Sequence, residues 1–330
     1  MLDLQRMTFM IPLQLEDENG YRKRNIKLII DNLLNTYDAN IKIIESGSSQ
    51  KYEPPLDSRI DYKFEQSDSP YLHRTRLINE MLDSVETEFV CNYDADILFS
   101  PKTFKTAGNL LGSGEADVVY PFGKLKMDQF RIWADVNYHK VFDANEFEFE
   151  LNNEFKSGAF EQVQAWLTHY GHCQIFRTQV YRDGYMENEN YLHLCPEDFE
   201  RGERFQKLGY NVKWMTDNKV LHFEHPCPSR PEHGSKATVG ECRNLLNKYN
   251  LPYDTDISFD DFVEIQMDGG NPFAGDEKPA FEQSKIYQKL VPGIYDVYDL
   301  HDRIIAMNKE ELIEYYKNEA YLNKYKKECV

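Results

Sequence analysis

The chain of 330 residues lacks several features that would narrow its class. No stretch approaches the roughly 18 uninterrupted apolar residues of a membrane span, and the N-terminus has no basic and then apolar leader. We therefore expect a soluble, cytoplasmic protein. Its six cysteines have no regular spacing, which argues against a dense disulfide scaffold and favours reduced thiols. The absence of an internal repeat and of a low-complexity tract excludes a repeat protein.

Basic residues are scarce relative to acidic ones, 38 against 56, and the formal charge is -18. This charge repels phosphate backbones and anionic lipid, so nucleic acid is not an expected partner. A nucleotide substrate would need help against the same repulsion, most simply from a divalent cation held by carboxylates. Core material is plentiful, because 41% of the residues are hydrophobic and 14% are aromatic, and this predicts a folded protein.

Strand and helix patterns alternate along the first part of the chain. Apolar runs of strand length lie at 7–13, 41–46, 60–64 and 89–93. Helical spacing of apolar residues predicts helices over 26–37 and 74–85 between them. The strand, helix, strand order is that of βαβ units, so the chain is predicted to be an α/β protein with a mostly parallel central sheet flanked by helices.

The later part of the chain is less regular. Short strands are predicted at 117–121, 173–176 and 211–214. Helices are predicted at about 197–208, 241–249 and 309–327. The acidic and aromatic segment 122–165 is interpreted as an insertion that covers a site, and the proline-bearing segment 226–231 as a loop or domain boundary.

Two carboxylates, Asp94 and Asp96, directly follow the predicted strand 89–93. In an open parallel sheet, ligands bind beyond the carboxyl ends of the strands, so both acids face the expected crevice. Acids at this spacing can hold a hard divalent ion while a substrate diphosphate supplies further oxygens. The alternative interpretation is a solvated turn with no ligand.

A second pair of acids, Glu197 and Asp198, opens the predicted helix 197–208. Carboxylates are favoured at a helix start by its free amides and its dipole, so capping alone explains their presence. A carboxylate held there is also well placed to act as a general base toward a hydroxyl group.

Two histidines, His222 and His225, follow at the end of another predicted strand. One of them could complete the site of the strand-end acids. A separate zinc site with Cys227, His233 and Cys242 is the alternative, although the spacing differs from that of a standard zinc finger.

In this order and spacing, the motifs resemble those of GT-A fold glycosyltransferases, especially family-2-like enzymes and the catalytic modules of galactosyltransferase and chondroitin-polymerase type. The motifs that carry the resemblance are Ile11-Pro12, Arg22 with Arg24 and Asn25, Asp94-Ala95-Asp96, Gly171 to Arg177, Glu197-Asp198 with Arg204 and Gly209, and His222. The chain departs from the pattern at 183–187, where relatives often carry Gly-Gly-Phe-Asp-Glu, and at Glu200, where a second Asp is common.

The resemblance implies a donor site at the strand ends. Asp94 and Asp96 would bind Mn²⁺ or Mg²⁺ that bridges the diphosphate of a nucleotide sugar. His222 would be the third protein ligand, with His225 as its competitor.

The resemblance also assigns the nucleotide and the chemistry. Glu45 would recognise the base and ribose, with Pro12 and Arg22 nearby. Asp198 would be the general base of an inverting enzyme, and Glu197 the neighbour that binds acceptor or donor sugar.

The implied domains are a GT-A-like catalytic domain over 1–240, with a nucleotide-binding half at 1–121 and an acceptor half at 122–240, and a helical C-terminal extension at 241–330. The extension ends in a lysine cluster that either touches lipid headgroups weakly or merely solvates a helix.

The implied function is that of a metal-dependent hexosyltransferase of polysaccharide biosynthesis. It would move a sugar from a nucleotide donor, expected to be UDP-linked, to a glycan or other hydroxyl acceptor. A nucleotidyltransferase that makes nucleotide sugars is one alternative, but it usually has a Gly-rich basic loop after the first strand, where residues 13–20 are acidic here. A non-enzymatic carbohydrate-binding module is the other alternative.

Overall fold

The computed structural model describes residues 1–15, 20–67, 72–122, 131–134, 160–161, 171–191, 197–215, 220–223, 301 and 303–320 of the chain. The chain divides into two compact units. The first consists of Met1–Leu192, Glu197–His225 and Ile305–Val330, and it contains the strands of both β-sheets and the helices that flank the larger sheet.

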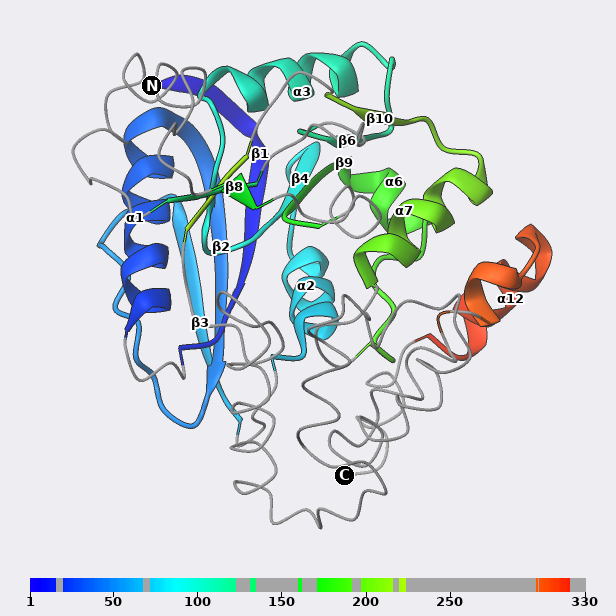
Figure 1. Ribbon diagram of the computed structural model, residues 1–330, viewed down its shortest axis with the longest axis horizontal. Helices are drawn as coiled ribbons and strands as arrows, with labels where there is room; N and C mark the ends of the chain where they lie inside the picture. Colours follow the sequence, from blue (N-terminus) through cyan, green and yellow to red (C-terminus); the bar gives the residue numbers. More distant parts are fainter. Residues whose placement is uncertain are drawn as a thin grey trace. The chain divides into compact units, whose positions relative to one another are not determined.

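A seven-stranded sheet forms the centre of the first unit (Figure 1). Its strands, in spatial order, are β10 (Val212–Trp214), β6 (Val118–Tyr120), β9 (Cys173–Arg177), β4 (Phe89–Tyr93), β1 (Leu2–Leu13), β2 (Tyr37–Gly47) and β3 (Ile60–Gln66). Strand β9 is antiparallel to both of its neighbours, and all the other pairs are parallel. The predicted α/β class with a mostly parallel sheet is therefore confirmed.

Helices flank this sheet. They are α1 (Tyr21–Thr36), α2 (Arg74–Asp83), α3 (Lys102–Gly112), α6 (Thr178–Asp183), α7 (Glu197–Leu208) and α12 (Lys309–Asn318). The apolar stripes that predicted α1 and α2 are buried, as in Ile29 and Leu77. Helix α1 stops at Thr36, however, and Tyr37, the last residue of the predicted stripe, already belongs to β2.

The order of the strands creates a switch point beside β1. The chain runs from β1 through α1 to β2 and β3 on one side, and α2 then returns it to β4 on the other side. Crossovers that leave in opposite directions open a crevice at the carboxyl ends of the two central strands, and ligands of open α/β sheets bind there. Because β9 is antiparallel, its first residue, Cys173, pairs with Tyr93 at the same edge.

A four-stranded sheet lies next to the residues that follow β4. Its order is β5 (Ile97–Leu98), β11 (Val220–Phe223), β7 (Arg131–Ala134) and β8 (Phe160–Glu161). Strand β11 pairs with β5 in antiparallel fashion, which brings a late segment of the chain against the turn that carries Asp94 and Asp96.

Aromatic side chains fill the centre of the large sheet. The ring of Phe9 in β1 lies 5.5 Å from that of Tyr93 and 5.0 Å from that of Phe104, centroid to centroid, both in edge-to-face geometry. Edge-to-face pairs add to the stabilisation that burial of the rings already provides. Cys91 and Cys173 lie in the same core as free, buried thiols.

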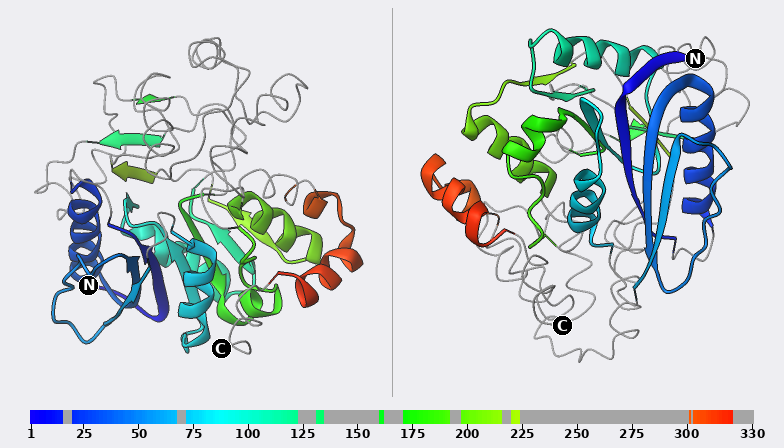
Figure 2. Two further views of the ribbon diagram at one scale, coloured as in Figure 1. Left: turned by 90° about the horizontal axis from the view of Figure 1, so that it is seen from below. Right: turned by 180° about the vertical axis from the view of Figure 1, so that it is seen from behind.

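The predicted C-terminal extension is described only in part. Helix α12 packs against α7 in the first unit, as two further views show (Figure 2). The predicted helix at 241–249 and most of the predicted insertion at 122–165 lie outside the described residues, and the domain boundary at 240 stays a prediction. No helix in the described part of the chain is long and apolar enough to cross a membrane.

Candidate active site

Asp94 and Asp96 follow β4 directly, at the switch point. The backbone N–H of Asp94 donates to the carbonyl of His172, which ties the turn to the start of β9. Burial raises the pKa of Asp94, Arg74 opposes the shift, and the neighbouring Asp96 adds to it. A carboxyl group whose pKa is raised by burial and by a second carboxylate beside it marks a place where a cation is favoured.

Arg74 joins Asp94, which follows β4, to Glu197 and Asp198, which begin α7. Its Nη2 lies 2.8 Å from Asp94 Oδ1, and its Nη1 lies 3.2 Å from Asp198 Oδ1. The same Nη1 is 3.5 Å from Glu197 Oε1. Burial disfavours the charged guanidinium, but the three carboxylates outweigh it and hold the pKa of Arg74 above its usual range. The two acid pairs predicted from separate motifs thus belong to one cluster.

The acids of α7 differ from each other in their surroundings. Asp198 accepts hydrogen bonds from Arg74 at 3.2 Å and from Arg201 Nη1 at 2.8 Å, both at Oδ1. Burial, with the charge of Asp198 as the next cause, raises the pKa of Glu197 from its ordinary 4.5 to about 8. Among the described residues, Glu197 Oε2 has no hydrogen-bond partner. Glu197 therefore keeps its proton to a higher pH than an ordinary carboxyl group, beside an arginine-bound Asp198.

A buried hydrogen-bond network holds Arg201, one of the two arginines that donate to Asp198. Arg201 is fully buried and forms a bidentate pair with Glu187 at 2.5 and 2.8 Å, while its Nη1 also donates to Gln174 at 2.6 Å. Tyr181 donates to the Glu187 carboxylate, and Asn92 donates to the Tyr181 hydroxyl at 2.6 Å. Since bidentate arginine pairs fix geometry as well as charge, this network sets where Arg201 can hold Asp198.

Gly171 and His172 fill the space between the two acid pairs. A side chain built at Gly171 would place its Cβ 3.5 Å from Asp198 Oδ2. His172 has a φ of 67°, in the left-handed region, and its Nδ1 lies 3.7 Å from Asp94 Oδ2. Strained residues of this kind persist where the surrounding structure fixes them, and they cluster at functional sites. The sequence placed both residues in a family motif and did not reveal their position in the site.

The backbone at His222 runs alongside the turn that carries Asp94 and Asp96. His222 pairs with Ile97 across β11 and β5, and the next residue, Phe223, donates its N–H to the Asp96 carbonyl at 2.7 Å. The His222 side chain, like His225, Cys227, His233 and Cys242, lies outside the described residues. Among the side chains that are described, no group of three or more His, Cys, Asp or Glu is arranged to hold a metal ion.

The predicted nucleotide-binding residues share the carboxyl edge of the sheet with the acids. Pro12 lies opposite Ile44 near the end of β1, and Arg22 lies in the first turn of α1. Glu45, near the end of β2, is fully buried. The proposed contacts of these residues with a nucleotide stay a prediction.

The Glu45 carboxylate is engaged within the protein. It accepts the backbone N–H groups of Lys51 at 2.9 Å and Tyr52 at 3.1 Å, and the Tyr62 hydroxyl at 2.6 Å. A buried carboxylate with three donors holds its neighbours firmly. Glu45 therefore fixes the loop that follows β2 against β3.

Comparison with known proteins gives structural matches alone: no protein-family model and no curated protein matches the chain. Among solved structures, the chain is similar to residues 1–349 of S. aureus TarS, at 11% identity and a TM-score of 0.43, with 94% of this chain and 89% of that chain covered. It is similar to the mannosyltransferase PcManGT from Pyrobaculum calidifontis in complex with GDP-Man and Mn²⁺, at 12% identity and a TM-score of 0.42, covering 96% and 88%. A third match is the catalytic domain of Drosophila beta1,4galactosyltransferase 7, at 13% identity and a TM-score of 0.38, covering 79% and 84%.

The solved structures that match thus include glycosyltransferases, the class that the sequence motifs resemble. At identities and TM-scores this low, the chemistry has to be judged from the residues of the site itself.

Proposed function

We propose that the chain is a metal-dependent, inverting glycosyltransferase that uses a nucleotide sugar. One observation carries the proposal: the Arg74 side chain contacts Asp94 at the end of β4 and Asp198 at the start of α7. A carboxylate suited to a cation and a carboxylate suited to take a proton therefore lie within reach of one guanidinium. A metal-assisted, inverting transfer that separates a diphosphate from a sugar uses both, on either side of the bond that breaks.

The charge of the cluster favours a cation together with a diphosphate. The cluster contains five carboxyl groups and two guanidinium groups, those of Arg74 and Arg201. The carboxyl groups are those of Asp94, Asp96, Glu187, Glu197 and Asp198. The excess is three negative charges, or two with Glu197 protonated, so a diphosphate entering alone would be repelled.

The donor set fits Mn²⁺ or Mg²⁺. Asp94 and Asp96 offer carboxylate oxygens, the ligands that hard divalent ions prefer. Strand β11 runs past them, and its His222 pairs with Ile97, the residue that follows Asp96. We assign Asp94, Asp96 and His222 as the ligands. Bound there, the ion would neutralise charge on the leaving nucleoside diphosphate.

Asp198 is the proposed general base. Both hydrogen bonds described for it end on Oδ1, and Oδ2 faces the backbone of Gly171, where the absence of a side chain keeps space for a hydroxyl group. Asp198 takes the proton as the acceptor oxygen attacks the sugar, and direct displacement inverts the anomeric carbon. In its protonated form, which its raised pKa favours, Glu197 beside it can donate a hydrogen bond to a sugar hydroxyl.

The finer assignments are part of the same proposal. The donor is a UDP-linked hexose held near Pro12, Arg22 and the Glu45 loop, and the acceptor is a glycan or another hydroxyl compound. The setting is polysaccharide synthesis in the cytoplasm, and residues 1–240 form the catalytic domain.

A thermal-shift panel of nucleotide sugars, with and without Mn²⁺, tests the function. Ligand at 100 times its dissociation constant stabilises the folded state by about 2.7 kcal/mol, a readily measured shift. We expect one nucleotide sugar to stabilise the protein only when Mn²⁺ is present, and to be hydrolysed slowly in the same mixture. If no nucleotide sugar binds or is hydrolysed with Mn²⁺, the proposal is wrong. Binding of free glycans alone would identify a carbohydrate-binding module. Formation of nucleotide sugars from nucleoside triphosphate and sugar phosphate would identify a nucleotidyltransferase.

A further inference from the structure

The loop at 184–191, which follows α6, holds an unfavourable backbone conformation. Tyr185 and Met186 have φ angles of 70° and 51°, both in the left-handed region that residues with side chains rarely adopt. Two such residues in succession persist only where the surrounding structure fixes them. The loop also carries Glu187, the partner of Arg201 in the network behind Asp198.

Helix α7 holds the first part of this loop. Arg204, fully buried, donates to the carbonyls of Gly184 and, at 2.7 Å, Met186. A side chain at Gly184 would bring its Cβ into a clash with the Phe205 ring, so the glycine permits the close packing of the loop on α7. The residue before the strained pair and the second residue of the pair are thus attached to one helix.

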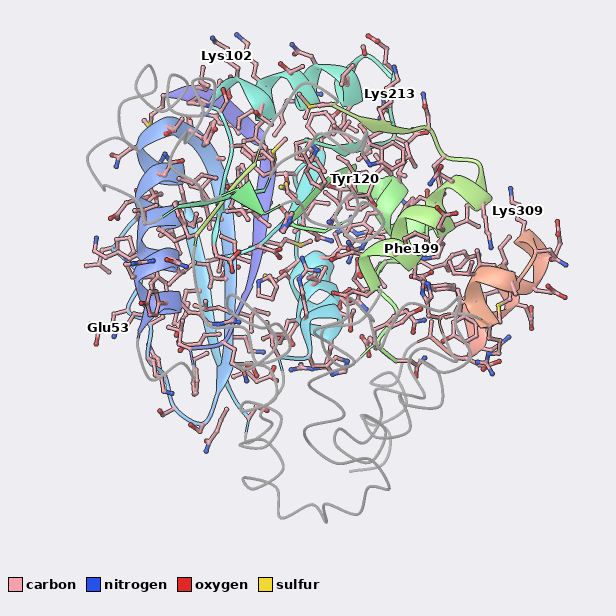
Figure 3. The ribbon with its side chains drawn as sticks, in the orientation of Figure 1. Glu53, Lys102, Tyr120, Phe199, Lys213 and Lys309 are labelled. Atoms are coloured by element: carbon pink, nitrogen blue, oxygen red, sulfur yellow. The ribbon has the colours of Figure 1, made fainter. Side chains whose placement is uncertain are left out.

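Helix α12 holds Arg204 in turn. The Tyr316 hydroxyl donates to Glu200 Oε1 at 2.6 Å, and the same oxygen accepts from Arg204 Nε at 2.9 Å. The guanidinium carbon of Arg204 also lies 4.4 Å from the centre of the Tyr316 ring, in cation–π geometry. Figure 3 shows α12, labelled at Lys309, beside α7, labelled at Phe199.

The second part of the loop is attached to α12 directly. The Tyr315 hydroxyl accepts from Asn188 Nδ2 at 3.1 Å and from Asn190 Nδ2 at 3.0 Å. The backbone N–H of Glu189 donates to the carbonyl of Ala320 at 2.8 Å. The strained loop therefore lies between α7 and a helix more than 100 residues later in the sequence.

Two contacts connect the loop to the proposed base, Asp198. Glu187 pairs with Arg201 through both carboxylate oxygens, and Arg201 donates to Asp198 at 2.8 Å. From the other side, Asn79 of α2 donates to the Glu187 carbonyl at 3.0 Å and accepts the Glu187 N–H at 2.8 Å. Glu187 is therefore held by α2 and α7 on one side and by the conformation of its own loop on the other.

We propose that α12 is a positioning element of the catalytic site, with Tyr316 as its main positioning residue. It acts through Glu200 and Arg204 on the loop at 184–191, and through Glu187 and Arg201 on Asp198. The inference rests on the proposed function in one respect, namely that Asp198 is the base. It gives the C-terminal part of the chain a role in turnover and none in donor binding.

The test compares Tyr316→Phe with Lys317→Ala. The first removes one hydroxyl and keeps the ring; the second changes an exposed side chain one position along the same helix. Hydrogen exchange read by mass spectrometry should show faster exchange at 184–191 in Tyr316→Phe alone. With the donor found in the thermal-shift panel, kcat should fall by roughly 2- to 30-fold, the range typical of residues coupled at a distance, while the donor KM stays unchanged.

Two results would overturn the inference. One is exchange at 184–191 that is equal in Tyr316→Phe, Lys317→Ala and the unmodified protein, which would show that α12 does not hold the loop. The other is faster exchange with unchanged kcat, which would show that the loop does not position the base. Failure of the unmodified protein to bind any nucleotide sugar would refute the proposed function instead, because the exchange comparison needs no substrate.

Discussion

Replacing Arg74 by Met tests whether a cation completes the acid cluster. The substitution keeps much of the aliphatic volume and removes the guanidinium that contacts Asp94, Glu197 and Asp198. Three carboxyl groups then lose their common partner. We expect a less stable protein in the absence of metal and a larger response to Mn²⁺, since Arg74 and the ion compete for Asp94.

The contacts set the size of the effect. Removing one partner of a buried ion pair typically costs about 3–5 kcal/mol. The side chain of Arg74 is 15% exposed and that of Asp94 is 26% exposed, so water screens part of the interaction and the lower end applies. A cost of about 3 kcal/mol lowers the Tm by about 6 °C, at about 2 °C per kcal/mol for a large chain.

The matched control is Arg76→Met, two residues further along α2. Arg76 is 20% exposed, pairs with Glu65, and lies 3.2 Å from Glu80, away from the site. Its loss also removes one positive charge and two ion pairs. Thermal unfolding with and without Mn²⁺ should therefore show a lower Tm in both variants without metal, and a recovery with Mn²⁺ in Arg74→Met alone. Equal Mn²⁺ responses in the two variants would refute the charge argument.

Three further substitutions test individual acids. Asp198→Asn should abolish transfer and leave donor binding largely intact, which a donor titration by calorimetry checks; loss of donor binding would contradict the role of a base. Asp96→Ala should remove Mn²⁺-dependent donor binding, whereas the exposed control Asp61→Ala should not, and transfer that persists in excess chelator would refute the metal assignment. Because the pKa of Glu197 is raised to about 8 from 4.5, the folded state keeps a proton that the unfolded chain loses, so this group lowers stability progressively as the pH rises from 4.5 to 8. In Glu197→Gln this contribution should vanish, and urea unfolding across that pH range would show a flatter profile; an unchanged slope would contradict it.

The sequence predicts the elements that carry strong periodic signals. Helix α7 spans 197–208 as expected, because acids favour its first turn and Gly209 follows its end with a φ of 95°, a conformation suited to glycine. Strand β4 also has the predicted bounds. Both elements end at points that local chemistry determines, so no tertiary information is needed to place them.

Other elements are missed for local reasons. Helix α3 buries Phe104, Ala107 and Leu111 at helical spacing, but Gly108 and threonines interrupt its pattern. Helix α6 has six residues, too few for a periodic signal. The direction of β9 is also invisible in its sequence, since an apolar run has the same pattern in a parallel and an antiparallel strand.

The acids of the site can be predicted from the sequence, whereas their partners cannot. Asp94 and Asp198 stand at the ends of recognisable elements, and that position indicates a crevice. Arg74 is 20 residues from the first acid and 124 from the second, and no local pattern joins positions so far apart. Glu187 similarly lies in a segment that departs from the family pattern, so its pairing with Arg201 appears only in the fold.

Arg74 nevertheless leaves a trace in the sequence, as a cation at the wrong end of a helix. It is the first residue of α2, whose first turn contains no acid, and the N-terminal end of a helix disfavours positive charge. Local chemistry that conflicts with its own element points to a compensating partner elsewhere, and such conflicts gather at functional sites. Here the compensation comes from the first turn of α7, whose acids meet Arg74 at the end of β4. Two helix starts therefore converge on the carboxylates of the site, and the cation between them is Arg74; under the proposed function a divalent ion adds further positive charge there once the diphosphate is bound.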